Sequence, residues 1–310
     1  MTTPEQAATE PRTDGRLEEV ADGVFAYVQP DGGWCLNNAG VIVSGGRTAL
    51  IDTAATEARA RRLREAVRTV SPTMPDYLVN THFHGDHVYG NFVFPEALVI
   101  GHERTRSEMA AAGLHLTTLW PEVCWGDLQP SLPTLTYRDG LTLHVGDTVV
   151  ELIHPGPAHT TDDTVVWLPG QRVLFTGDIV MSGVTPFCAM GSVSASIAVI
   201  GRLRSLGART VVTGHGPVGG PEVFDETERY LRWIQEVARD GLAAGLTPLQ
   251  AARDCRLGGF ARLVDAERLV PNLHRAYAEL RGAAPGDPLD VGALFAEMAR
   301  FHGRPPTCRA

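Results

Sequence analysis

The run Thr81-His82-Phe83-His84-Gly85-Asp86-His87 is the most informative segment of this sequence. It holds four ligand-type side chains within six residues, and it directly follows a short apolar segment that predicts a strand. Imidazole nitrogens and carboxylate oxygens are the ligands that zinc and similar divalent cations take in proteins. The spacing of two lets an extended loop point His82 and His84 the same way, which leaves Asp86 and His87 for a second position.

Three later segments supply further candidate ligands, and each lies beside a predicted strand. These candidates are His159 in Gly-Pro-Ala-His-Thr, Asp178 in Phe-Thr-Gly-Asp and His215 in Thr-Gly-His-Gly-Pro. A single histidine in such a place more often satisfies backbone groups of a turn than binds a metal. The dense block together with three later candidates favours a metal site over that explanation.

Strands and helices alternate up to about residue 220, and only helices are predicted beyond it. The predicted strands are 24–28, 39–43, 48–52, 77–80, 98–101, 141–145, 149–153, 164–168, 173–176 and 210–213. The predicted helices are 56–70, 103–112, 195–206, 222–243, 247–253, 265–280 and 290–301. Thr56 is suited to cap the first of these helices, and a Thr-Pro-Leu-Gln capping box opens the helix at residue 247.

This order of elements predicts an α/β fold in which two sheets are flanked by helices. We expect residues 1–16 to be a disordered N-terminus, because they are polar and lack apolar periodicity. Residues 17–220 are expected to form the catalytic domain. Residues 221–310 are expected to form a helical segment that packs on it.

The charged residues restrict the chemistry open to this chain, because all 27 positive side chains are arginines and no lysine occurs. Without lysine, the chain has no Schiff-base aldolase chemistry, no lysine anchor for pyridoxal phosphate and no P-loop lysine. The formal net charge of −9 argues against nucleic acid as a partner.

A cytoplasmic location without membrane contact is expected. No apolar run approaches the roughly 20 residues that a membrane span requires, and the polar N-terminus lacks the apolar run of a secretory signal. The number of cysteines is odd and none forms a Cys-x-x-Cys pair, which argues against a disulfide framework. They are Cys35, Cys124, Cys188, Cys255 and Cys308.

The histidine-aspartate block and the three later ligands resemble the signature of the metallo-β-lactamase superfamily over about residues 20–217. The resemblance implies an αββα sandwich that holds two divalent cations, with zinc favoured over manganese or iron. It implies that one cation is bound by His82, His84 and His159, that the other is bound by Asp86, His87 and His215, and that Asp178 bridges them. Asp86 is also implied as the catalytic proton acceptor. We expect the chain to differ from secreted antibiotic-hydrolysing members, because its polar N-terminus does not predict a signal peptide and because it carries Asp178 where some have cysteine.

Five further segments resemble the metallo-β-lactamase-fold cyclases of aromatic polyketide pathways, the actinorhodin second-ring type. These segments are 32–39, 119–121, 141–146, 180–187 and 272–276. That resemblance implies closure of the second ring of a polyketide tethered to an acyl carrier protein, with hydrolysis of the thioester. The alternatives are a general thioester or lactone hydrolase similar to glyoxalase II or the lactonases, and a non-catalytic metal-binding protein.

A flat substrate of this kind needs aromatic and sulfur-containing walls near the metals. The candidates are Trp34, Trp120, Trp125, Met181 and Phe187 in predicted loops, and His274 in a predicted helix. The loop tryptophans could instead simply cover the edge of the sheet. An acidic carrier protein would also need a positive surface, for which the arginines of 59–68, 202–204 and 229–232 are candidates.

Overall fold

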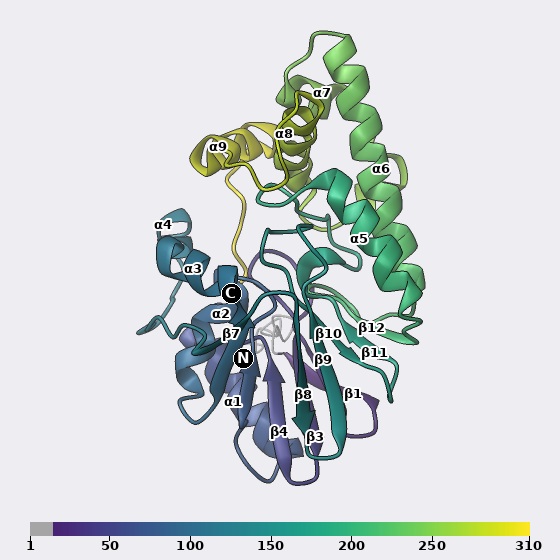
Figure 1. Ribbon diagram of the computed structural model, residues 1–310. Helices are drawn as coiled ribbons and strands as arrows, with labels where there is room; N and C mark the ends of the chain where they lie inside the picture. Colours follow the sequence, from purple (N-terminus) through teal and green to yellow (C-terminus); the bar gives the residue numbers. More distant parts are fainter. Residues whose placement is uncertain (1–14) are drawn as a thin grey trace, which may run out of the picture.

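The structure is a computed structural model that describes residues 15–310 (Figure 1). The predicted disordered N-terminus falls outside the described residues up to residue 14. Residue 16, the last residue of the predicted disordered segment, was predicted wrongly. It begins strand β1 (Arg16–Ala21), which pairs antiparallel with β2 (Val24–Val28). Polar residues are tolerated in β1 because it is an edge strand, of which Leu17 and Val20 still pack against the apolar cores.

The first sheet contains seven strands in the order of the sequence. After β1 and β2 come β3 (Ala39–Ser44), β4 (Arg47–Ile51), β5 (Tyr77–Val79), β6 (Leu98–His102) and β7 (Leu135–Tyr137). Strands β1 to β4 are antiparallel, whereas β4 to β7 are parallel. Parallel strands need crossover connections, and the helix α1 (Glu57–Val70) supplies the one between β4 and β5. Thr56 caps α1 as predicted, since its side chain accepts a hydrogen bond from the Arg59 amide.

The second sheet contains five strands in the order β12-β11-β10-β9-β8. Their bounds are β8 (Gly140–Val145), β9 (Thr148–Ile153), β10 (Val165–Leu168), β11 (Val173–Phe175) and β12 (Thr210–Val212). Neighbouring strands are antiparallel except β11 and β12, which are joined by α5 (Val193–Ser205) and run parallel.

The two sheets stack face to face with helices on their outer sides, which confirms the predicted αββα sandwich. Successive side chains of a strand point to opposite faces, and β10 shows the result. Val166 and Leu168 lie in the core between the sheets, while Val165 and Trp167 pack on the outer helices. On the other sheet, Leu50 belongs to the cluster that α1 covers.

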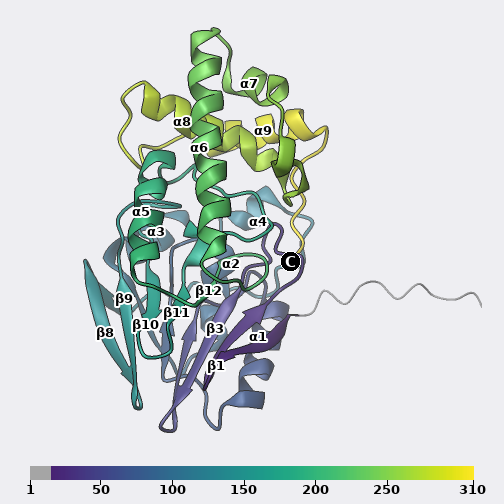
Figure 2. The ribbon, with the colours of Figure 1, turned by 90° about the vertical axis from the view of Figure 1, so that its right-hand side faces the viewer.

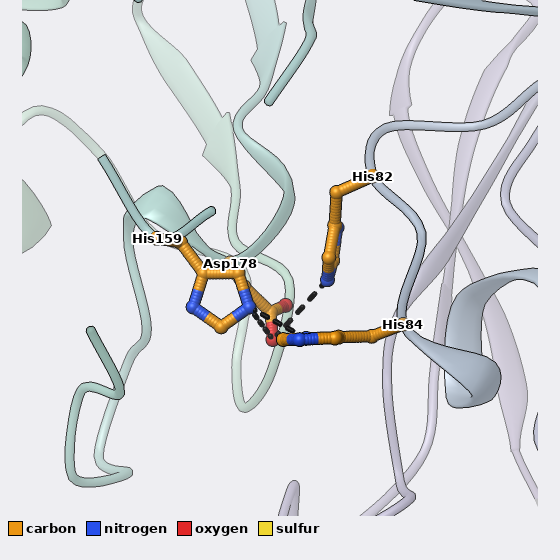
Figure 3. A group of neighbouring side chains, drawn as sticks. All are labelled: His82, His84, His159 and Asp178. Atoms are coloured by element: carbon orange, nitrogen blue, oxygen red, sulfur yellow. Dashed lines mark hydrogen bonds and ion pairs between the residues drawn. The ribbon is translucent and has the colours of Figure 1, made fainter. Parts of the chain in front are cut away.

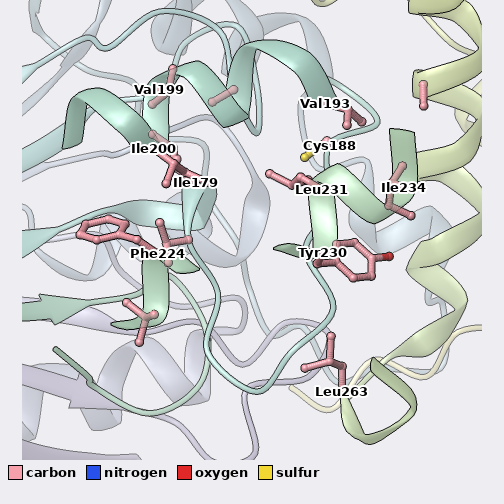
Figure 4. Close-up of a cluster of buried hydrophobic side chains, with 14 of the residues drawn as sticks. Ile179, Cys188, Val193, Val199, Ile200, Phe224, Tyr230, Leu231, Ile234 and Leu263 are labelled. Atoms are coloured by element: carbon pink, nitrogen blue, oxygen red, sulfur yellow. The ribbon is translucent and has the colours of Figure 1, made fainter. Parts of the chain in front are cut away.

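Helices alone follow residue 221, and they stand above one end of the sandwich (Figure 2). They are α6 (Glu222–Ala243), α7 (Pro248–Asp254), α8 (Leu269–Leu280) and α9 (Val291–His302). The predicted capping box of α7 is present between Thr247 and Gln250. Phe224 and Leu231 of α6 share one buried cluster with Ile179, Val199 and Ile200 of the sandwich (Figure 4). This shared cluster fixes the C-terminal helices against the ligand-bearing side of the fold.

Short helices and the C-terminal tail complete the surroundings of the site. Helix α2 (Gly85–Val88) lies within the histidine-aspartate block, and α3 (Glu103–Ala112) and α4 (Leu116–Leu119) follow β6. The tail returns to the sandwich, where the Trp120 indole donates to the Pro306 carbonyl and the Arg309 amide donates to the Trp34 carbonyl. Among the described residues, no helix is both long and apolar enough to cross a membrane.

Candidate metal centre

All seven predicted ligands lie at one edge of the sandwich, in loops or in the short helical turns that follow strands. The histidine-aspartate block follows β5, His159 follows β9, Asp178 follows β11 and His215 follows β12. Because β9, β11 and β12 run in one direction within their sheet, their carboxyl ends reach the same edge. The end of β5 faces them from the other sheet, so residues that are far apart in the sequence converge here.

The first group of ligands contains His82, His84, His159 and Asp178, whose ligand atoms lie within 4.8 Å of one another. His82 and His84 project from one loop toward His159 and Asp178 on two others (Figure 3). The Asp178 Oδ2 atom lies 3.9 Å from His82 Nε2 and 3.5 Å from His159 Nε2. His84 faces the group with its other nitrogen, since its Nδ1 atom lies 2.8 Å from His159 Nε2.

The second group contains Asp86, His87 and His215, and Asp178 lies between the two groups. The Asp178 carboxylate reaches His87 Nε2 through Oδ1 at 3.1 Å and His215 Nε2 through Oδ2 at 3.3 Å. Asp86 Oδ2 also lies 3.3 Å from His215 Nε2. Asp178 therefore contacts both groups, as expected of a bridging carboxylate.

Close backbone approach at Gly214 makes room for this carboxylate. A Cβ atom at Gly214 would lie 1.9 Å from Asp178 Oδ1, a distance that no side chain could occupy. The residue before His215 therefore has to be glycine for His215 and Asp178 to share the centre.

A hydrogen-bonded pair, Asp52 and Thr81, orients two of the histidines. Asp52 accepts from Thr81 through its amide and its hydroxyl, at 2.8 Å and 2.7 Å, and lies 2.8 Å from His87 Nδ1. The Thr81 hydroxyl in turn lies 3.0 Å from His82 Nδ1. Partners of this kind set the tautomer of a metal-ligating histidine, and here they leave Nε2 of His82 and His87 facing the centre.

The other three histidines are also held by their outer nitrogens. His215 Nδ1 donates to the Gly32 carbonyl at 2.9 Å, and His159 Nδ1 donates to the Phe187 carbonyl. His84 is held through Nε2, which lies 3.1 Å from the Met190 sulfur. Each of the five imidazoles therefore has one nitrogen fixed by the protein and one left for the centre.

The inner atoms of the centre fit a pair of divalent cations. Three of them, His82 Nε2, His87 Nε2 and Asp178 Oδ1, are buried and form no well-aligned hydrogen bond, although His87 Nε2 and Asp178 Oδ1 lie 3.1 Å apart. Buried polar atoms are otherwise almost always paired, and clustered nitrogen and carboxylate atoms of this type match zinc or a similar ion. The donor set therefore fits a binuclear centre.

The pKa shifts of the histidines also fit a centre that binds cations. Burial lowers the pKa of His82 well below its ordinary value, which keeps this imidazole neutral and able to bind a cation. Burial also disfavours charge on His215, but Asp178 and Asp86 outweigh it and raise the pKa of this imidazole to about 9. Without metal, His215 therefore carries a proton at neutral pH. A cation that binds at the second group has to displace this proton.

A pocket lined by aromatic and sulfur-containing side chains opens onto the centre. It encloses about 520 Å³ of space, its open mouth included, and four predicted wall residues line it: Trp34, Trp120, Met181 and Phe187. The Trp34 ring centroid lies 5.6 Å from those of both Trp120 and Phe187. The Phe187 ring lies 6.0 Å from that of His159, so the aromatic wall reaches the metal ligands.

Two predicted wall residues, Trp125 and His274, lie outside this pocket. Trp125 is buried beneath it, because its indole nitrogen donates to the Trp120 carbonyl at 2.9 Å. His274 points along the C-terminal helices and pairs with Glu297 at 2.7 Å. Loop and helix assignments do not specify the rotation of a side chain about its element, so the sequence could not show that these two side chains lie outside the lining of this pocket.

Sequence reasoning missed several residues of the pocket and of the ligand shell. Phe295 and Arg268 come from the C-terminal helices, and His115 precedes α4. No local pattern distinguishes these three from ordinary helix residues. Asp52 was detectable in principle, because it is a carboxylate at the end of a strand that neighbours β5.

Most arginines of the clusters considered for carrier docking are buried or form ion pairs. Arg59 is buried, and Arg64 pairs with Glu96 at 2.5 Å. Arg204 pairs with Asp225 at 2.7 Å and with Glu228 at 3.0 Å. Docking through these clusters stays a prediction.

Comparison with known proteins places these features in a family. A family model described as the metallo-beta-lactamase superfamily matches residues 32–215. The type 2 metallo-beta-lactamase of Bacteroides fragilis is 23% identical over 238 residues, which cover 73% of this chain and 89% of that protein. The linear primary-alkylsulfatase of a Pseudomonas strain is 24% identical over 305 residues, which cover 81% of this chain and 57% of that protein.

A third relative and a solved structure extend the comparison. The alpha subunit of 2,4-dinitroanisole O-demethylase from a Nocardioides strain is 29% identical over 184 residues, covering 57% of this chain and 47% of that subunit. This chain therefore spans about half the length of the demethylase subunit. The structure of a metallo-beta-lactamase from Pontibacter korlensis matches with a TM-score of 0.60 and 22% identity, covering 71% of this chain and 99% of that one. This structural likeness shows the fold.

Proposed function

The chain belongs to the metallo-β-lactamase superfamily and is a hydrolase of that superfamily, and on this premise we propose that it is a thioesterase and cyclase. Its proposed substrate is an aromatic polyketide intermediate tethered to an acyl carrier protein, in which it closes the second ring and cleaves the thioester. One observation carries the proposal: the metal ligands open into a largely apolar pocket whose walls include four aromatic rings, those of Trp34, Trp120, Phe187 and Phe295.

The seven ligands form two sets, one for each cation, joined by Asp178. His82, His84 and His159 would hold one cation, Asp86, His87 and His215 the other, and Asp178 would touch both. When bound, two divalent ions lower the pKa of water toward neutrality and stabilise negative charge on a carbonyl or enolate oxygen. This also offers a route to carbon–carbon bond formation in a chain that has no lysine for a Schiff base.

Asp86 is suited to move the proton. Its side chain is 13% exposed and lines the pocket, while its Oδ2 atom lies 3.3 Å from His215 Nε2. Burial and Asp178 favour the protonated carboxyl, but His87 and His215 outweigh them and hold the pKa of Asp86 below its ordinary value. The carboxylate is therefore ionised, and it would accept a proton from the attacking water and return it to the leaving thiolate.

The walls favour a flat, largely apolar acyl group. Trp34, Trp120 and Phe295 form a mutually contacting cluster with ring centroids 5.4 to 5.9 Å apart. Phe187 extends this cluster to the histidines. Rings at such distances bury large apolar areas and attract other aromatic rings, which supports an aromatic substrate rather than a small hydrophilic one.

A second candidate is a general thioester or lactone hydrolase of the same superfamily. The hydrogen bonds with which Asp52, Thr81 and Gly32 orient the histidines favour this candidate, because they do not involve the aromatic walls of the pocket. The same centre would therefore serve simpler esters. The aromatic pocket is the feature that this candidate leaves unexplained.

The test compares two thioesters with the zinc-loaded full-length protein. An N-acetylcysteamine thioester of an aromatic β-ketoacid whose ring carries an ortho 2-oxoalkyl group can close a ring between its enolate carbon and that ketone. It should release thiol and give a cyclised acid one water lighter than the uncyclised acid, detected by mass spectrometry. S-Lactoylglutathione should react far more slowly, and the Asp86→Asn variant should lose thiol release. Efficient turnover of S-lactoylglutathione without cyclised product would favour the second candidate, and turnover of neither would overturn the proposal.

A further inference from the structure

Arg268 lies in the wall of the metal pocket but comes from the C-terminal helices, beyond the residues that the family model matches. Its side chain is only 2% exposed. Nη1 donates to the Thr185 carbonyl and contacts the Met181 sulfur, both at 3.2 Å, and Nη2 lies 3.1 Å from Asp265 Oδ2. Nε is buried and has no hydrogen-bond partner.

The guanidinium belongs to the aromatic wall that leads to the metals. Its central carbon lies 4.1 Å from the Trp34 ring centroid, a cation–π contact. The Trp34 indole is fixed in turn, because its nitrogen donates to Glu267 Oε1 at 2.9 Å. Phe187 then connects Trp34 to His159. A planar molecule lying along this wall would meet Arg268 at one end and the metal ligands at the other.

The ion-pair partner of Arg268, Asp265, also faces a second arginine. Within residues 15–310, Asp265 is the one ion-pair partner of Arg268, and the other oxygen of Asp265 lies 3.8 Å from Arg309 Nη2. Arg309 forms its closer ion pair with Asp31, so Asp265 serves mainly Arg268. Glu267 adds a negative charge nearby, but one of its oxygens accepts from Trp34 and the other lies 3.8 Å from His302 Nδ1.

We propose that Arg268 is a specificity-determining residue that binds an acidic oxygen of a planar aromatic substrate, namely a phenol, an enol or a carboxylate. The inference rests on the proposed function, because it specifies the substrate class of the same pocket. Arg268 lines the pocket, and the N–H of its buried Nε has no hydrogen-bond partner, so an acidic oxygen of the substrate would supply the missing acceptor. The ring carrying the oxygen would lie against Trp34, with its reacting carbonyl toward the metal ligands.

A purely structural role for Arg268 is the competing explanation, since its bonds to Thr185 and Asp265 join two loops. The test must therefore separate charge recognition from folding. Binding of 2-naphthoate and of its uncharged analogue 2-naphthamide is measured by tryptophan fluorescence quenching on the zinc-loaded full-length protein. No turnover is required, so a failure to cleave thioesters would not affect this measurement.

The expected result is a preference of about tenfold or more for 2-naphthoate over 2-naphthamide in the unchanged protein. Arg268→Met should reduce this ratio toward one, with amide affinity little changed, and Arg268→Lys should retain part of it. Arg275→Met is the matched control, because Arg275 is also buried in the C-terminal helices and bonds to the Ala189 carbonyl but does not line the metal pocket. It should leave the ratio unchanged.

Two results would overturn the inference. The first is a ratio near one in the unchanged protein. The second is an undiminished ratio in folded, metal-loaded Arg268→Met, which would assign the preference to the metals alone. If Arg268→Met fails to fold, Arg268→Lys decides, because a full ratio with a shorter ammonium in place of the planar guanidinium would equally contradict specific recognition.

Discussion

Asp52 Oδ2 lies 2.8 Å from His87 Nδ1, and both side chains are buried. This contact orients a ligand of the second group from outside the centre. Removal of such an outer partner typically costs 10- to 100-fold in metal affinity. We therefore expect Asp52→Ala to lower the zinc affinity of the second site by about that factor, measured by competition with a chromophoric chelator. Asp147→Asn, an exposed change in the β8–β9 turn, is the control. An unchanged zinc affinity of the second site in Asp52→Ala would contradict the orienting role of Asp52.

Asp178 contacts His87, His159 and His215 at 3.1 to 3.5 Å. Asp178→Ala should therefore abolish the shared arrangement and leave fewer than two tightly bound metal ions per chain, with most activity lost. Elemental analysis after exhaustive dialysis measures this directly. Two retained ions per chain in the variant would show that Asp178 does not bridge them.

Phe187 serves the site in two ways that a substitution can separate. Its carbonyl orients His159, whereas its ring forms part of the pocket wall. Phe187→Ala keeps the carbonyl, so metal content should be unchanged while the KM for an aromatic thioester rises about tenfold. Phe260→Ala, which removes a ring packed against Tyr230 and Trp233 away from the pocket, is the matched control and should leave KM unchanged. Equal effects of the two changes would contradict a role for the Phe187 ring in substrate binding.

Asp162 is buried near the centre without being one of its ligands, and burial raises the pKa of its carboxyl to about 6. The unfolded chain has an aspartate pKa of about 3.9. Because the folded state binds this proton more tightly, the contribution of Asp162 to stability is greatest below about pH 4. It is lost as pH rises toward 6.

Asp162→Asn should therefore raise the free energy of unfolding at pH 7.5, by about 2 kcal/mol relative to its effect at pH 4. Urea unfolding of the metal-free protein and variant at both pH values measures the difference. A difference between variant and parent that is equal at the two pH values would contradict the assigned pKa.

Much of the fold was predictable because its local signals agree with its tertiary structure. Thr56 and Thr247 cap their helices as their sequence positions predict. Strand β1 was missed because its alternating polar residues resemble a solvated tail until Val28 is found opposite Arg16. Pairing of that kind is a long-range contact that the local pattern does not encode.

The metal ligands were predictable for a different reason: strand ends in such a sandwich converge on one edge. The structure brings all seven together. The pocket walls were predicted less well, because a wall depends on side-chain rotation and on packing between distant segments. Trp125 points away from the pocket toward the Trp120 carbonyl, whereas Phe295 and Arg268 reach it from the C-terminal helices.

The central claim is that two metal ions held by these seven ligands support thioester cleavage. Its most direct test is a zinc titration of chelator-treated protein, in which thiol release from an aromatic β-ketoacyl thioester is followed at each addition. We predict that activity is absent without metal, rises with added zinc and stops rising at two equivalents per chain. Thiol release that is independent of zinc, or none at any stoichiometry, would contradict the claim.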